Sequence, residues 1–118
     1  MAHPNLNSPA KVEGLSVASA VGTSATTIVS NAEASSATIR IVSMYAANID
    51  GTSAADVTVK LATGTSAWSI ASTVSVPADA TVEVISGRAL YLKEGDSLTA
   101  AASAAGDIEV VVSYEKIT

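Results

Sequence analysis

The sequence contains no cysteine, no phenylalanine and a single histidine, and only 3% of its residues are aromatic. Without cysteine, the chain can form no disulfide, no zinc–thiolate site and no cysteine nucleophile. A triad that needs an imidazole would have to use His3, which we expect to be a solvated residue of the N-terminus. No Gly-Lys-Ser/Thr sequence follows any glycine, so a phosphate loop is missing as well. These absences predict a protein that is not an enzyme and that holds no cofactor and no metal ion.

Positive charge is also scarce. Lys and Arg total 6 against 11 Asp and Glu, which gives a formal net charge of −5. Phosphate backbones and anionic membranes require clustered cations, whereas these are scattered singly: Lys11, Arg40, Lys60, Arg88, Lys93 and Lys116. No apolar run approaches the ~18 residues of a membrane span, and the N-terminus lacks a signal-peptide pattern. We therefore expect no nucleic-acid partner, no membrane partner, and folding in a cytoplasm.

The residues that are abundant favour β-strands. Val and Ile total 22 against 6 Leu, and 52 of the 118 residues are Ala, Ser or Thr. β-branched residues suit the pleated surface of a sheet. Apolar and polar residues alternate in 56–61 and 108–114, and turn residues such as Asp50-Gly51 separate the alternating runs. We expect strands near residues 15–21, 25–30, 37–48, 55–62, 67–76, 80–86, 89–93, 97–103 and 107–116.

This pattern predicts an all-β fold, namely an antiparallel, jelly-roll-like β-sandwich of about eight strands over residues 15–118. A barrel is the alternative, because period-two patterns do not fix topology. Residues 98–105 are rich in alanine and could form a short helix, but they lack a 3.6-residue apolar stripe, so we favour a strand. We expect the core to contain Val42, Tyr45, Val57, Val59, Leu61, Trp68, Ile70, Val74, Val84, Leu90, Leu92, Leu98, Ile108, Val110 and Val112.

Residues 1–14 differ from the rest of the chain. They contain Pro4 and Pro9 and show no hydrophobic period. Proline has no backbone N–H to donate to a strand ladder, and terminal segments are ordered only where contacts tie them down. We therefore expect residues 1–14 to form an extended N-terminal arm.

Two turns and one aromatic residue are the candidates for ligand binding. Asn48-Ile49-Asp50 and Glu94-Gly95-Asp96 place oxygen atoms where Ca²⁺ could accept them. Neither has the dense spacing of a calcium loop, so we interpret both as turns in which Asn and Asp bond their own backbone. Trp68 begins an alternating run and is expected to fill the core. Stacking on a sugar would instead require its indole to be exposed.

Five stretches of the sequence together resemble one family. The resemblance spans residues 39–117, about two-thirds of the chain, and it is to small β-sandwich virion proteins of tailed bacteriophages. The stretches are Ile41-Val42-Ser43-Met44-Tyr45-Ala46-Ala47-Asn48-Ile49-Asp50-Gly51, Val57-Thr58-Val59-Lys60-Leu61, Val76-Pro77-Ala78, Leu90-Tyr91-Leu92-Lys93-Glu94-Gly95-Asp96-Ser97-Leu98 and Val110-Val111-Val112-Ser113-Tyr114-Glu115.

The resemblance implies a structural role in a virion that is assembled in the host cytoplasm. The expected protein is a capsid decoration (cement) protein, a homotrimer bound to the major capsid protein or to other virion proteins. Its arm would contact the capsid or neighbouring subunits through Pro4, Asn5, Leu6 and Pro9. The same fold would also suit a neck, tail or baseplate component, or a fibre-attachment domain. A carbohydrate- or receptor-binding module is the alternative from a different class.

Overall fold

A computed structural model describes residues 4–87 and 89–118 of the chain. These residues form β-strands and no helix, which confirms the expected all-β class. No described segment is therefore a helix long and apolar enough to cross a membrane. The strands are β1 (Val12–Val21), β2 (Thr26–Ser30), β3 (Thr38–Asn48), β4 (Ala55–Thr63), β5 (Ser66–Val76), β6 (Thr81–Ile85), β7 (Leu90–Leu92), β8 (Asp96–Ala102) and β9 (Ile108–Ile117).

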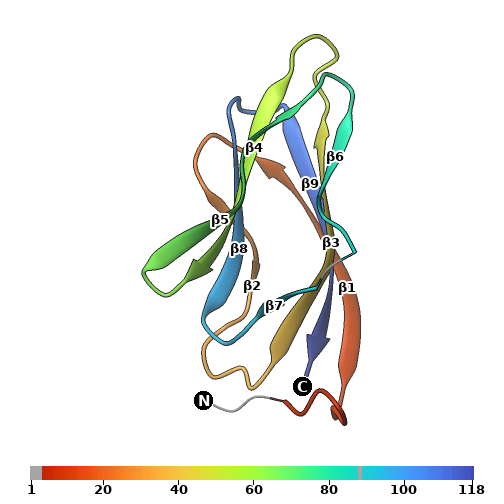
Figure 1. The fold of residues 1–118 in the computed structure, drawn as a ribbon, viewed down its shortest axis with the longest axis vertical. Coiled ribbons are helices and arrows are strands. Elements are labelled where there is room, and N and C mark those ends of the chain that lie inside the picture. Colours follow the sequence, from red (N-terminus) through yellow and green to blue (C-terminus); the bar gives the residue numbers. More distant parts are fainter. Residues whose placement is uncertain (1–3, 88) are drawn as a thin grey trace.

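The strands form two sheets that pack face to face (Figure 1). The five-stranded sheet has the order β1-β9-β3-β6, with β7 also paired to β3, and the four-stranded sheet has the order β2-β8-β4-β5. Every pair is antiparallel. The chain moves repeatedly from one sheet to the other, so that strands far apart in sequence, such as β1 and β9, become neighbours. The predicted antiparallel sandwich is confirmed, and the described residues form nine strands in place of about eight.

The core lies between the sheets and consists mainly of aliphatic side chains. In β8, burial alternates strictly from Asp96 to Ala102, which is the pattern of a strand with one covered face. The alanine-rich segment is therefore a strand, as the sequence favoured. The largest fully buried side chains are Ile41, Met44, Leu92, Leu98, Ile108, Val21, Val57, Val59, Val76, Val110 and Val112.

Two residues that we predicted to be in the core, at and beyond a β-bulge in β3, are exposed. Ile41 pairs with Tyr114 of β9, but Ser43 pairs with Ser113, so two residues of β3 oppose one step of β9. An extra residue reverses the alternation beyond it. Tyr45, which lies beyond the bulge, consequently faces solvent, whereas Val42 directly follows buried Ile41 and faces outward by ordinary alternation. They are 38% and 39% exposed, so the prediction that they are buried was wrong.

Two more residues that we predicted to be in the core lie in the β4–β5 hairpin and are exposed. Trp68 pairs with Leu61 near the end of the hairpin, which projects beyond the sandwich (Figure 1). Because the opposite sheet does not reach this far, Trp68 is 63% exposed and Ile70 is 37% exposed. Trp68 is thus not a core residue; its indole Nε1 donates a hydrogen bond to Thr63 Oγ1 at 3.3 Å. Gly64 turns the hairpin with a φ of 61°, a conformation that glycine adopts without steric cost.

Candidate functional site: the outer faces of the two sheets

The outer face of the five-stranded sheet carries an apolar surface, the Tyr45 patch, which consists of Val42, Tyr45 and Val111. Tyr45 of β3 lies directly opposite Val111 of β9, and residues in such cross-strand pairs contact each other. Ala18 of β1 is the next residue across the sheet from Val111. The three residues of the patch are 38–44% exposed. The β3 bulge completes this patch, because it places Tyr45 on the same outer face as Val42.

Carboxylates dominate the charge around the Tyr45 patch. Glu83 of β6 lies opposite Tyr45, and Glu109 lies two residues before Val111 on β9. Neither makes an ion pair with a described residue. Arg40 is engaged elsewhere, because its Nη1 donates to Glu115 Oε1 at 2.9 Å. That hydrogen bond raises the pKa of the guanidinium above its usual value. A surface that binds the patch would therefore best present apolar groups with cations around them.

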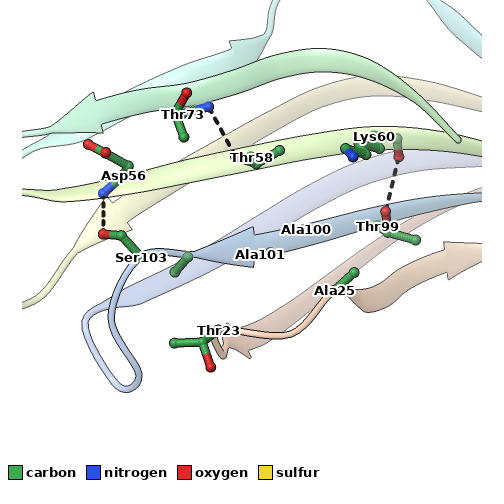
Figure 2. Close-up of a pocket in the computed structure, with 11 residues that line it drawn as sticks. Thr23, Ala25, Asp56, Thr58, Lys60, Thr73, Thr99, Ala100, Ala101 and Ser103 are labelled. Atoms are coloured by element: carbon green, nitrogen blue, oxygen red, sulfur yellow. Dashed lines mark hydrogen bonds between the residues drawn. The ribbon is translucent and has the colours of Figure 1, made fainter.

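A shallow trough of about 290 Å³ crosses the outer face of the four-stranded sheet. β4 contributes Asp56, Thr58 and Lys60, whose side chains point outward because they alternate with buried Val57 and Val59. Figure 2 shows Thr23 and Ala25, from the segment before β2, on the far side of β8 from β4. The other lining residues are Thr73, Thr99, Ala100, Ala101, Ala102 and Ser103.

Internal hydrogen bonds already occupy several polar groups of the trough (Figure 2). Thr58 Oγ1 accepts from the backbone N–H of Thr73 at 3.0 Å, and Ser103 Oγ accepts from that of Asp56 at 2.9 Å. Asp56 and Lys60 lie four residues apart on one strand, roughly 13 Å at ~3.3 Å per residue. The trough contains no imidazole or thiol, so its chemistry is weak hydrogen bonding between separated opposite charges.

A second hollow, of about 230 Å³, lies where the sheets separate between β5 and the β6–β7 edge. Its lining is almost entirely apolar and includes exposed Ile70: Ile70, Val84, Ile85, Ser86, Ala89 and Leu90. Trp68 is only two residues from Ile70 in sequence. This side of the sandwich therefore exposes apolar groups, although they lie on the inward faces of their strands.

The Asn48–Asp50 turn has the backbone bonding that we predicted. Asn48 Oδ1 accepts from the backbone N–H of Asp50, and Asp50 Oδ1 accepts from the N–H and the hydroxyl of Thr52, each at 2.9 Å. These bonds from Thr52 lower the pKa of Asp50. One oxygen of each side chain is thus engaged within the turn.

The turn before β8 places two carboxylates inside the protein. Asp96 Oδ1 accepts from Lys93 Nζ at 2.9 Å. Glu94 is only 4% exposed, and its Oε1 accepts no hydrogen bond from the described residues. Across residues 4–87 and 89–118, no three His, Cys, Asp or Glu side chains are grouped so that they could hold a metal ion.

The predicted arm is partly folded back, and β1 begins at Val12, three residues earlier than expected. Asn5 starts a turn: its carbonyl accepts from Ser8 N–H at 3.1 Å, and its Oδ1 accepts from Asn7 N–H at 3.0 Å. Ala10 and Lys11 then hydrogen-bond to the carbonyl of Thr118. Of the predicted contact residues, Asn5 and Leu6 are exposed, and Pro4 and Pro9 are half-buried. His3 lies outside the described residues.

Comparison with known proteins supports the fold and does not identify a family. No protein-family model matches the chain, and no curated protein sequence matches it. A solved structure described as "Bacillus endospore appendages form a novel family of disulfide-linked pili" matches with a TM-score of 0.52. The match covers 92% of this chain and 87% of that chain at 15% sequence identity. At this identity the likeness concerns the fold alone.

Sequence reasoning missed both outer-face features. It placed Val42 and Tyr45 in the core because both are large and apolar. A period-two pattern puts these two residues on opposite faces, and only the bulge brings both to the outer face. The alternation of residues 56–61 did predict that the trough residues Asp56, Thr58 and Lys60 share the polar face of a strand. Their grouping with residues 23–25 depends on the pairing of β2 with β8 and of β8 with β4, which alternation does not reveal.

Proposed function

We propose that this chain is a non-enzymatic structural subunit of a tailed-phage virion, most specifically a decoration protein that binds the capsid and stabilises the head. The observation that carries this proposal is the Tyr45 patch, which exposes Val42, Tyr45 and Val111 on the outer face of the five-stranded sheet. Exposed apolar groups that include an aromatic ring are typical anchors of protein interfaces. The virion assignment itself comes from the sequence resemblance.

The proposed partner is the major capsid protein or another protein of the virion. Glu83 and Glu109 near the Tyr45 patch favour a partner surface with cations around an apolar centre. The N-terminal turn adds a second contact through Pro4, Asn5, Leu6 and Pro9, of which Leu6 is 49% exposed. A neck, tail or baseplate position would use the same surfaces, and the number of copies in each particle separates it from a position on the head.

Any assembly of this chain must form without disulfide bonds between copies. The structurally similar protein belongs, by its description, to a family of disulfide-linked pili. This chain has no cysteine, so it cannot use that linkage. The shared fold supports the idea that such a sandwich suits a repeating subunit. We propose that its contacts use exposed apolar surface and strand edges.

A glycan-binding module is the second candidate, and exposed Trp68 is the observation that favours it. Its weakness is geometric. Trp68 pairs with Leu61, which continues the inward-facing series of Val57 and Val59, whereas the trough hydroxyls lie on the outward face of β4. One sugar ring could not use both surfaces. Titration of Trp68 fluorescence with glycans tests this role: a saturable shift in the emission maximum would support it over assembly.

The proposed function is tested by adding the purified chain to virions or heads that lack it. We expect the wild-type chain to sediment with the particles and Val111→Asp to lose binding at least tenfold. Ile49→Asp is the matched control, because Ile49 is 54% exposed in a loop outside the patch. Equal binding of Val111→Asp and wild type would overturn the role of the patch, and no binding of wild type to any particle would overturn the virion assignment.

A further inference from the structure

β1 is a long sheet edge with one side unpaired. It pairs with β9 over its whole length, Val12–Val21, without a register shift. On its other side it makes no backbone hydrogen bond to any described residue. The strand contains no proline, and Glu13 is its only charged residue. A regular, nearly uncharged edge of this kind is a template on which another strand can pair.

The other three edges are protected in ways that β1 is not. β2 has only five residues and a register shift against β8. β5 has two register shifts against β4, and Thr73 within it has a φ of 47°. The fourth edge is divided between β6 and β7, with five and three residues. Short strands and bulges discourage edge-to-edge pairing, so β1 is the edge that is suited to strand addition.

We propose that the β1 edge binds the β1 edge of a second copy of this chain, as an antiparallel pair related by a two-fold axis. The two five-stranded sheets would then form one continuous sheet, with both four-stranded sheets on the same side. This inference goes beyond the proposed function and does not depend on a role in a virion. It also differs from the trimer that the sequence resemblance implies, because a two-fold contact closes with two copies.

The apolar side chains at the edge favour one register. Leu15 faces inward but is 41% exposed, and Val17 is half-buried. The inward faces of the two β1 strands lie on the same side of the joined sheet only if odd-numbered residues lie opposite odd-numbered residues. A pair centred on Ser16 places Leu15 opposite Val17 of the second copy, twice across the axis. A centre on Val17 would instead place Glu13 opposite buried Val21. We therefore infer a centre at Ser16.

Neither charge nor bulk opposes this pairing. On the outward face β1 presents Val12, Gly14, Ser16, Ala18 and Ala20. The largest of these side chains, Val12, would lie opposite Ala20 of the second copy, so no two large side chains meet on this face. The antiparallel arrangement keeps the two Glu13 carboxylates at opposite ends of the strand pair, although each chain carries a net charge of −5. Pairing from Val12 to Ala20 would form roughly 8–10 backbone hydrogen bonds, which is the number found in a typical protein interface.

The mass of the full-length chain in solution gives the first test. We expect sedimentation at micromolar concentrations to give twice the chain mass of 11.7 kDa. An inward-pointing charge at an edge blocks pairing, so Leu15→Lys should be monomeric and folded. Ile70→Lys is the matched control, because Ile70 is 37% exposed on the β5 edge, and this variant should stay dimeric. A monomeric or trimeric wild type, or loss of the dimer in both folded variants, would overturn the proposal.

Cross-linking tests the register and does not depend on the lysine variant remaining folded. The chain has no cysteine, so a single introduced thiol can only bond to its copy. In the proposed register, Ser16→Cys places two thiols opposite each other, within the Cα separation that a disulfide spans. In Ala18→Cys the two Cα atoms would be about 13 Å apart along the strands. Oxidation should therefore cross-link Ser16→Cys and not Ala18→Cys; the reverse result, or no cross-link with either, contradicts the inference.

Discussion

At the scale of single residues, Asn48 connects three segments of the chain through one buried amide. Only 2% of its surface is exposed. Its Nδ2 donates to the carbonyls of Ser53 and Val76, at 2.9 and 3.0 Å, and its Oδ1 accepts from Asp50 N–H. Buried polar groups stay inside a protein only when such partners satisfy them. Asn48 therefore fixes the loop after β3 against the end of β5.

Replacing Asn48 by Ala should destabilise the fold strongly. The change removes three hydrogen bonds and leaves two carbonyls without their donor, which costs roughly 2–4 kcal/mol of the free energy of unfolding. Urea denaturation followed by circular dichroism measures the loss. Asn7→Ala, at an exposed position of the N-terminal turn, should change the same free energy by about 0.5 kcal/mol or less. Equal effects of the two substitutions would show that the Asn48 network does not stabilise the fold.

The Asp50 carboxylate should make stability depend on pH in acid. Hydrogen bonds from Thr52 lower the pKa of Asp50 below its ordinary value of 3.8 in the folded protein. Its contribution is therefore complete above pH 3.8 and is lost as the pH falls through the lower folded pKa. Asp50→Asn should therefore make the melting temperature depend less steeply on pH below pH 3.8. Asp107→Asn controls for the loss of one negative charge, and an unchanged acid slope in Asp50→Asn contradicts this reading.

At the scale of elements, β3 shows what the sequence could and could not predict. Alternation placed a strand at residues 37–48, and the structure has one at Thr38–Asn48. The same alternation does not reveal the bulge near Val42, because the bulge depends on how β3 pairs with β9. The outward position of Tyr45 in the Tyr45 patch could not be predicted from the sequence for that reason. The exposure of Trp68 was missed for a different reason. A strand face is buried only where a second sheet covers it, and the sequence does not show where that sheet ends.

β9 offers a direct test of the assigned faces, because Val110 and Val111 are adjacent but lie on opposite sides. Val110 is fully buried, whereas Val111 is 44% exposed. Val110→Asp buries an unpaired charge and should lower the free energy of unfolding by roughly 3–5 kcal/mol, enough to unfold a marginally stable domain. Val111→Asp should lower it by about 1 kcal/mol or less. Thermal melting of both variants tests which residue faces the core. Similar melting temperatures would mean that the faces are wrongly assigned.

At the scale of the whole molecule, the proposed contact surfaces occupy separate regions. The Tyr45 patch covers an outer sheet face, β1 forms a lateral edge, and the N-terminal turn lies at the end of the molecule where the C-terminus is also found (Figure 1). One copy could thus pair with a second copy through β1 and still contact a different partner through its patch and its N-terminal turn. The sequence pattern alone did not predict where these surfaces lie, because their positions depend on which strands form the edges of the sheets.

Deleting residues 1–9 should separate the contact role of the arm from its structural role. The deletion keeps Ala10 and Lys11, which hydrogen-bond to Thr118. We expect the melting temperature to stay within a few degrees and binding to heads to be lost. Deleting residues 1–14 also removes the first three residues of β1 and should lower the melting temperature. If the chain without residues 1–9 decorates heads fully, the arm is not a contact.

The most direct test of the central claim is the copy number of this chain in purified virions, measured by quantitative mass spectrometry. A decoration protein covers repeated positions of the head, so the account predicts hundreds of copies in each particle. Three, six or twelve copies would contradict a position on the head and assign the chain to the neck or tail. Absence of the chain from purified particles would contradict the structural role altogether.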